Sequence, residues 1–375
     1  MRKKAVMVFF TVLFGFALGS CNGEQEESGI PPVVRCEYMV EAINKASEKM
    51  RLIAINYRDD LIVKSDNTLW GGRWAITLTD ERIARGMTGQ PIKLMENVAS
   101  VVAHRHVTLV LKTNNSLWTR GENRVRQFGD LPEIYRFTPR HLWDDVAVVA
   151  YQRGWIYAIK TDGRLYVRGI GFVDDESWCS SVVNVSAGIA KALVVTECGN
   201  LWAMGRHKYT SRHERLEPRF IMNDVTAVST GLLHSTAIRA DGSLWAWGWN
   251  VYGELGIGEM EERFYQEYPT RIMADVVAVL AGHYNTFAIR ADGSLWGWGC
   301  NWSGQLGDGT QINRHSPVKI MDDVIAVSSF STVETSADIG SAHTIAIRSD
   351  GSLWWWGWGE QLYPKMIEGI NLFVD

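Results

Sequence analysis

The sequence has little cysteine, little proline and no excess of positive charge. Its 375 residues include five Cys and nine Pro, and 42 acidic residues outnumber 38 Lys and Arg to give a formal charge of −4. Nucleic-acid-binding proteins usually have a clearly basic face, so we expect no nucleic-acid partner. No two cysteines have Cys-x-x-Cys spacing, which argues against a structural zinc site, and we expect neither a metal nor a cofactor. The 46% hydrophobic content excludes a mostly disordered chain.

Only one stretch is apolar over a long run, and it lies at the N-terminus. It extends from Ala5 to Leu18, directly after the basic residues Arg2, Lys3 and Lys4. At about 14 residues it is too short for a comfortable membrane span and is typical of a signal peptide. The segment Leu-Gly-Ser-Cys that ends at Cys21 resembles the bacterial lipobox, in which the Cys thiol carries diacylglycerol. An ordinary secretory signal is the alternative.

These features predict three segments. Residues 1–20 are a lipoprotein signal peptide with lipid attachment at Cys21, residues 21–35 are a flexible tether, and residues 36–375 form the folded domain. The protein is then exported and anchored in a membrane through its N-terminal lipid, in the periplasm or at the cell surface. Such a compartment permits disulfides. The sequence leaves two alternatives for the cysteines: a Cys179–Cys198 disulfide, or free thiols at these positions as well as at Cys36 and Cys300.

One hairpin motif recurs seven times. Each copy has Leu followed by an aromatic residue, at Trp70, Trp118, Tyr166, Trp202, Trp245, Trp296 and Trp354. Three residues before each aromatic stands Gly or Asn, and four before stands Asp or Asn in every copy but that of Cys198. Asp-Gly between apolar runs predicts a type I′ turn, in which both central residues have positive φ. Cys198 should therefore be strained.

Proline keeps the same register as the hairpins. Five prolines are each followed three residues later by Ile or Leu: Pro91, Pro139, Pro218, Pro269 and Pro317. Proline has no backbone N–H to donate to a neighbouring strand, so it is expected on an edge strand. Each unit is then about four short strands, and a ring of seven units buries both faces of each. The sequence predicts an all-β fold, a seven-bladed β-propeller of four-stranded antiparallel blades.

The two chain ends suggest how the ring closes. The segment Pro364–Ile367 repeats the proline pattern, but no hairpin follows it. The first unit, which starts at Met50, has no such segment before it. We expect the C-terminal strand to complete the blade that the N-terminal hairpin begins, so that neither end blade has an open edge.

The last three units carry a recognisable signature. Residues 237–248, 288–299 and 346–357 share Ala-Ile-Arg-x-Asp-Gly-Ser-Leu-Trp-x-Trp-Gly, and the first two are followed by Gly253-Glu-Leu-Gly and Gly304-Gln-Leu-Gly. This pattern resembles the regulator of chromosome condensation repeat family, whose fold is a seven-bladed propeller. Eukaryotic members include an exchange factor for a nuclear GTPase, a partner that an exported protein does not meet. The resemblance therefore implies the fold and not that activity.

We expect a monomeric protein-binding module that is not an enzyme. No nucleophile elbow or phosphate-binding loop is present, and the recurring Asp residues fit a role in turns. His234 and His343 occupy equivalent repeat positions, which favours a structural role. Aromatic residues in predicted loops are the candidate contacts: Trp249, Tyr252, Phe264, Tyr265, Trp302 and Phe330. A glycan-binding surface lipoprotein is the alternative, and a propeller hydrolase or lyase is less favoured.

Overall fold

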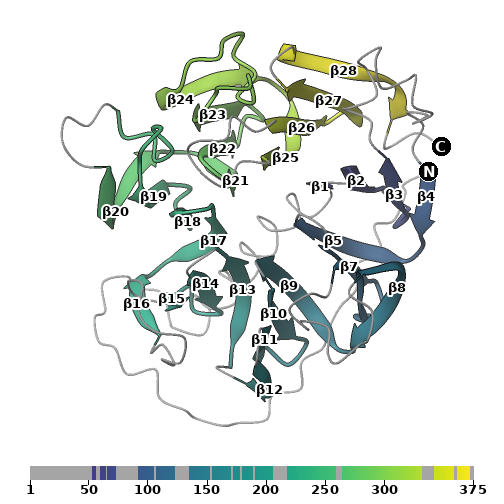
Figure 1. The fold of residues 1–375 in the computed structure, drawn as a ribbon. Helices are drawn as coiled ribbons and strands as arrows, with labels where there is room; N and C mark the ends of the chain where they lie inside the picture. The colour runs from purple at the N-terminus through teal and green to yellow at the C-terminus, as the bar shows by residue number, and fades with distance from the viewer. Residues whose placement is uncertain are drawn as a thin grey trace, which may run out of the picture.

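The described part of the chain forms seven antiparallel sheets. A computed structural model describes residues 53–55, 60–64, 66–72, 92–104, 107–122, 135–152, 154–169, 172–177, 180–188, 191–205, 218–258, 264–331, 342–358 and 361–371. They form 28 strands, four to each sheet, and the sheets stand around a central axis (Figure 1). The predicted seven-bladed propeller of four-stranded blades is confirmed. The predicted signal peptide, Cys21, the tether, Cys36 and Cys179 lie outside the described residues.

Each blade uses four consecutive strands. Blade 1 has β1 (Ile53–Ile55), β2 (Asp60–Val63), β3 (Leu69–Gly72) and β4 (Ile92–Met95), and blade 2 has β5 (Val98–His104), β6 (Val107–Lys112), β7 (Leu117–Glu122) and β8 (Tyr135–Trp143). Blade 3 has β9 (Val146–Gln152), β10 (Trp155–Lys160), β11 (Leu165–Gly169) and β12 (Phe172–Ser177). Blade 4 has β13 (Val182–Ala187), β14 (Lys191–Thr196), β15 (Leu201–Gly205) and β16 (Arg219–Met222). Blade 5 has β17 (Val225–Thr230), β18 (His234–Arg239), β19 (Leu244–Trp249) and β20 (Tyr265–Met273). Blade 6 has β21 (Val276–Ala281), β22 (Asn285–Arg290), β23 (Leu295–Gly299) and β24 (Arg314–Met321). Blade 7 has β25 (Val324–Ser331), β26 (Ala342–Arg348), β27 (Ser352–Gly357) and β28 (Gln361–Asn371).

The hydrophobic core is divided among the boundaries between blades. At the boundary between blades 5 and 6, Ile238 and Leu244 pack with Val276 and the fully buried Trp298. Burial on both faces explains why second strands such as β18 and β22 are almost continuously buried, whereas outer strands such as β20 are not. No helix among the described residues has the length and apolarity needed to cross a membrane.

The expected closure by a shared strand is wrong. Strand β28 pairs with β27 of its own blade, and β1 to β4 form a separate sheet. The ring closes instead through side chains, because Ile62 of blade 1 packs with Ile345, Trp355 and Ile367 of blade 7. Figure 1 shows the purple first blade beside the yellow last one. The proline segments are the fourth strands of the units that precede them, so every blade is complete within its own stretch of sequence.

The predicted type I′ turns are also wrong. Gly242 has φ +75°, but Asp241 is not among the residues with positive φ. The Gly242 N–H donates to the Arg239 carbonyl at 2.9 Å, which gives a three-residue connection of a type I turn followed by one left-handed residue. Only the Gly or Asn position needs positive φ, and Cys198 avoids the strain that a type I′ turn would impose.

Candidate binding face

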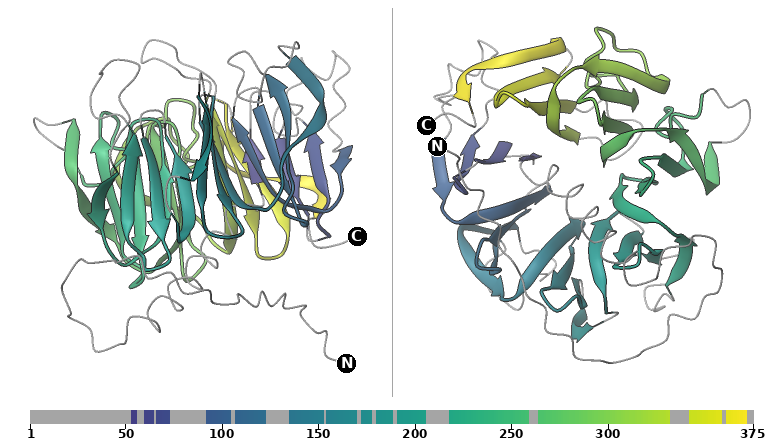
Figure 2. Two further views of the ribbon diagram at one scale, coloured as in Figure 1. Left: turned by 90° about the horizontal axis from the view of Figure 1, so that it is seen from below. Right: turned by 180° about the vertical axis from the view of Figure 1, so that it is seen from behind.

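Connection length distinguishes the two faces of the ring. The tight turns between the second and third strands lie on one face, the turn face. The connections between the third and fourth strands lie on the opposite face, the loop face, and include residues 250–264 of blade 5 and 300–313 of blade 6. Figure 2 shows from the side how the strands stand next to each other between these faces. All six predicted contact aromatics belong to the loop face or to strand ends that meet it.

On the turn face, the repeated Asp has a structural role. The Asp241 Oδ1 atom accepts hydrogen bonds from the Ser243 N–H at 2.9 Å and the Ser243 hydroxyl at 2.5 Å, and the Trp245 indole N–H donates to that hydroxyl at 2.9 Å. Blades 6 and 7 repeat this set of bonds. The hydrogen bonds from Ser243 lower the pKa of Asp241. These carboxylates are therefore occupied in holding turns.

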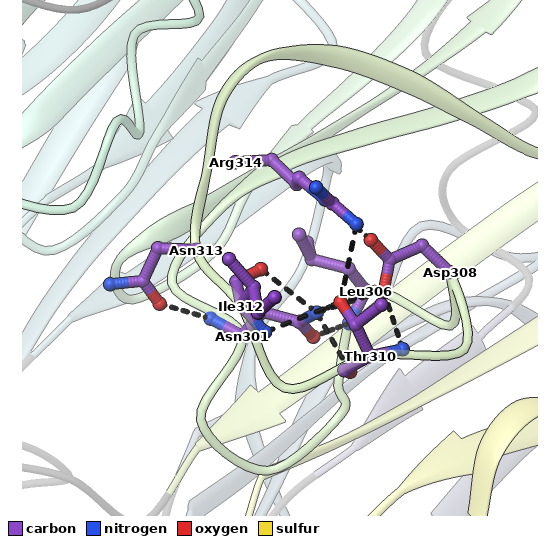
Figure 3. Close-up of polar contacts among 7 residues, drawn as sticks. All are labelled: Asn301, Leu306, Asp308, Thr310, Ile312, Asn313 and Arg314. Atoms are coloured by element: carbon purple, nitrogen blue, oxygen red, sulfur yellow. Dashed lines mark hydrogen bonds and ion pairs between the residues drawn. The ribbon is translucent and has the colours of Figure 1, made fainter.

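On the loop face, the blade 6 loop is organised around Asn301 (Figure 3). The Asn301 amide Nδ2 donates to Asp308 Oδ1 at 3.0 Å and to the Thr310 carbonyl at 3.0 Å, and its Oδ1 accepts the Leu306 N–H at 2.9 Å. The Arg314 Nε–H donates to Asp308 Oδ2 at 2.6 Å in an ion pair whose carboxylate is buried. This network of side-chain hydrogen bonds holds the loop in one conformation.

The same loops join one blade to the next. The Gln305 carbonyl accepts the Trp356 indole N–H and the Thr344 hydroxyl of blade 7, both at 2.8 Å. In blade 5, the Glu254 carbonyl accepts the Trp298 indole N–H at 3.0 Å and the Thr286 hydroxyl at 2.7 Å. The Gly-x-Leu-Gly segments are thus joints between blades, and a Cβ on the second glycine would strike the indole ring.

Three of the predicted contact residues come together as an exposed group on blade 5. Trp249, Phe264 and Tyr265 are 41%, 59% and 48% exposed, and the Trp249 and Tyr265 ring centroids lie 5.8 Å apart. The Trp249 N–H donates to the Leu233 carbonyl, which brings the exposed Leu233 alongside. With the exposed Val251, these five residues form what we call the apolar row, at the loop-face end of β19 and β20.

The other predicted aromatics lie elsewhere. Tyr252 and Trp302 are half-buried, with ring centroids 4.8 Å apart, and Tyr252 also contacts Tyr284 at 5.1 Å. They pack the blade 5 loop against the blade 6 loop and do not extend the apolar row. Phe330 belongs to β25, but its side chain lies outside the described residues.

Sequence reasoning missed the aliphatic members of the apolar row. Leu233 and Val251 are exposed in a turn and a loop, where an isolated aliphatic residue gives no sequence signal by itself. Tyr268 on β20 is also exposed, and it was not among the predicted contacts, which were taken from loops only. Val251 directly precedes the predicted contact Tyr252, and that position could have indicated it.

The equivalent histidines have the expected surroundings. His234 is buried, and its Nε2 atom lies 2.9 Å from the Thr286 hydroxyl of the next blade. Burial lowers the pKa of His234 to about 3, so the ring is neutral at physiological pH. His343, at the matching position of blade 7, is also buried. Across the described ranges, no group of three or more His, Cys, Asp or Glu is arranged to hold a metal ion.

Family models match part of the chain. Models of the regulator of chromosome condensation (RCC1) repeat match residues 225–254, 241–289 and 292–347. The chain carries RCC1 repeats. The matched residues run from β17 to β26. They include Glu254, Thr286 and Trp298, which tie blade 5 to blade 6, and Gln305 and Thr344, which tie blade 6 to blade 7.

Individual relatives share the repeats over part of their length. The chain is 28% identical to the ultraviolet-B receptor UVR8 of Arabidopsis thaliana over 213 residues, which are 50% of this chain and 46% of the receptor. It is 28% identical to protein RCC1 of Candida albicans over 44% of this chain and 38% of that protein. The chain thus spans less than half the length of these curated relatives. The crystal structure of human WBSCR16, at 19% identity, covers 74% of this chain and 83% of its own with a TM-score of 0.59, which shows a shared fold.

Proposed function

We propose that this chain is an exported, lipid-anchored RCC1-type propeller that binds another protein through the apolar row and does no catalysis itself. The exposed apolar row on blade 5 carries the proposal. The largest exposed apolar patch of a soluble protein is often a binding site. RCC1-like propellers form a family of protein-binding or regulatory modules, which supports the same class of function.

The composition of the row favours a protein over a glycan. The row contains the exposed aliphatic side chains of Leu233 and Val251 as well as the paired rings of Trp249 and Tyr265. Aromatic and aliphatic side chains grouped together match the centre of a protein interface, where a few anchors supply most of the affinity. A sugar-binding site depends more on flat aromatic faces flanked by polar groups. The repeated turn carboxylates are engaged in hydrogen bonds, which supports a role other than catalysis.

The lipid anchor is tested at Cys21. The proposal rests on the segment Leu18–Cys21 in the sequence, and a diacyl chain pair is enough for stable membrane attachment. Replacing Cys21→Ser should abolish metabolic labelling with a fatty acid and release the protein from the membrane fraction. Unchanged labelling would overturn the anchor.

Binding is tested by photocrosslinking in intact cells. A photoreactive phenylalanine analogue at position 264, in the row, should give a protein adduct. The same analogue at position 363, equally open but on β28, should not. Trp249→Ala should reduce the adduct about tenfold or more, as expected for an interface anchor. Absence of a protein adduct, together with Trp249-dependent binding on a glycan array, would replace this proposal with the glycan-binding one.

A further inference from the structure

The joints that follow blades 5 and 6 share one arrangement of hydrogen-bond donors. In each joint, an indole N–H and a hydroxyl from directly opposite positions on two strands donate to a single carbonyl oxygen of the preceding blade's loop. Trp298 and Thr286 form such a pair on β23 and β22, and both donate to the Glu254 carbonyl. The equivalent pair of blade 7 donates to the Gln305 carbonyl in the same way. A pair of this kind therefore marks a position for one acceptor oxygen.

The joint between blades 4 and 5 has the same pair of donors. Ser235 of β18 lies opposite Trp247 of β19, in the register that Thr286 and Trp298 have in blade 6. Trp247 is 4% exposed and packs with apolar residues of blade 4, and Ser235 is 0% exposed. The pair is thus buried at this boundary, as its counterparts are at the next one.

Blade 4 offers this pair no Gly-x-Leu-Gly segment. The sequence between β15 and β16, residues 206–218, contains no glycine. Among the residues that the structure describes, the Ser235 hydroxyl has no hydrogen-bond partner and the Trp247 indole N–H has no acceptor. Unpaired buried donors are costly and therefore rare in proteins, so two of them at one place indicate that an acceptor binds there.

A cation stands beside the pair. Lys191 begins β14 at the position that His234 has in β18, and His234 Nε2 lies 2.9 Å from the Thr286 hydroxyl of the next blade. The Lys191 Nζ atom lies 5.6 Å from the centre of the Trp247 ring. Within the described ranges it makes neither an ion pair nor a hydrogen bond. Burial lowers the pKa of Lys191 to about 8, so the amine still carries its charge at neutral pH.

We propose that Lys191, Ser235 and Trp247 form a carboxylate-binding site at the loop-face end of the joint between blades 4 and 5. The hydroxyl and the indole N–H bind one carboxylate oxygen, at the position that a loop carbonyl takes in the next two joints. A carboxylate suits the site better than a neutral carbonyl because it also neutralises the ammonium of Lys191. The carboxylate comes from a small organic acid or from the C-terminus of a polypeptide. The site is separate from the apolar row and does not depend on the proposed function.

Acylation of lysines by a soluble active ester, read by mass spectrometry on the full chain in detergent, tests the site. Acetate at about 0.2 M should slow modification of Lys191 about threefold or more relative to acetamide at equal concentration and ionic strength, because a bound carboxylate covers the amine. Lys112 is the control in the same molecule. Its Nζ also lies over an indole ring, 5.2 Å from the Trp118 centroid, but that indole N–H already donates to Ser116. The rate at Lys112 should be the same in both solutions.

Two forms of one peptide distinguish the sources of the carboxylate. Acetyl-triglycine with a free C-terminus is compared with the same peptide as its amide. Stronger protection of Lys191 by the acid form than by acetate, and none by the amide, identifies a polypeptide C-terminus. Protection by acetate alone identifies a small organic acid. Both results support the site, whereas equal protection by the acid and the amide overturns a carboxylate ligand.

Two variants separate binding from a general effect on the fold. Ser235→Ala removes one donor and leaves Lys191 in place, so it should abolish most of the protection by acetate. Ser116→Ala removes the hydroxyl of the control turn and should leave that protection unchanged. The site is overturned if Lys191 reacts equally fast in acetate and acetamide, if it reacts in neither, or if Ser235→Ala keeps full protection. The measurement needs no partner, so a failed photocrosslink overturns the proposed function and leaves this result standing.

Discussion

Trp298 of blade 6 donates its indole N–H to the Glu254 carbonyl of blade 5 at 3.0 Å, from a fully buried position. The two residues are 44 positions apart in the chain. The equivalent bond, from Trp356 to the Gln305 carbonyl, joins blade 6 to blade 7. The Gly-x-Leu-Gly segments thus join neighbouring blades, whereas the Asp, Ser and Trp of the hairpin motif hold turns within a blade, and the two contributions can be measured separately.

We expect Trp298→Phe to lower the free energy of unfolding by about 2 kcal/mol, because it removes the inter-blade hydrogen bond and leaves a small cavity. The control is Trp245→Phe. That indole is half-buried and bonds to Ser243 within its own turn, so the loss should be below about 1 kcal/mol. Denaturant unfolding measures the free energy of unfolding of both variants. Equal losses would contradict a special role for the hydrogen bond of Trp298 between blades.

Stability should depend on pH through Glu254. Its pKa is 4.5 when exposed, as in the unfolded chain, and about 7 in the folded protein, so the folded state binds the proton more tightly. The stabilisation is complete below about pH 4.5 and is lost as the pH rises through about 7. We expect Glu254→Gln to be the more stable form at pH 8, by on the order of 3 kcal/mol, with a smaller difference at pH 5. The melting temperatures of the wild type and Glu254→Gln, measured across this pH range, test this prediction. A difference between the two forms that does not change with pH would refute it.

The turn at Gly242 discriminates between two substitutions. Its φ is +75°, and a Cβ there would meet only ordinary contacts, the nearest at 3.5 Å from the Asp275 Cα. Backbone strain therefore dominates. Gly242→Val should destabilise the protein by about 1–2 kcal/mol more than Gly242→Asn, because Asn tolerates positive φ and a β-branched residue does not. Indistinguishable melting temperatures would argue against a strained position.

Ring closure by side chains predicts different effects for two neighbours on β28. Ile367 is buried in the cluster with Ile62 of blade 1, whereas Met366 is exposed. Ile367→Ala should cost about 2–4 kcal/mol, and Met366→Ala about 0.5 kcal/mol or less. Unfolding experiments on both variants compare them. A tolerated Ile367→Ala would mean that the closing contact contributes little.

The repeat unit was determined by local sequence. The hydrogen bonds of Asp241, Ser243 and Trp245 join residues two apart, so each motif carries its own turn wherever it lies in the chain. Seven such motifs, together with prolines that fit outer strands, were enough to predict the number of blades and strands. The type of turn was predicted wrongly: the Asp241 side chain accepts the Ser243 N–H, the Gly242 N–H donates to the Arg239 carbonyl, and only Gly242 has positive φ.

Tertiary structure decided what lies between the units. Trp249 and Tyr252 are both loop-face aromatics, yet one is exposed and the other packs against Trp302 of the next blade. Nothing within either residue's own motif distinguishes them, because the difference depends on which part of a neighbouring blade covers the side chain. The same holds for Glu254: the sequence shows an acid where the next repeat has Gln, and only the packing of Trp298 and Thr286 around it makes that acid a buried one. Local hydrogen bonds fixed the blades, and contacts between distant residues fixed the joints, the closure and the exposed surface.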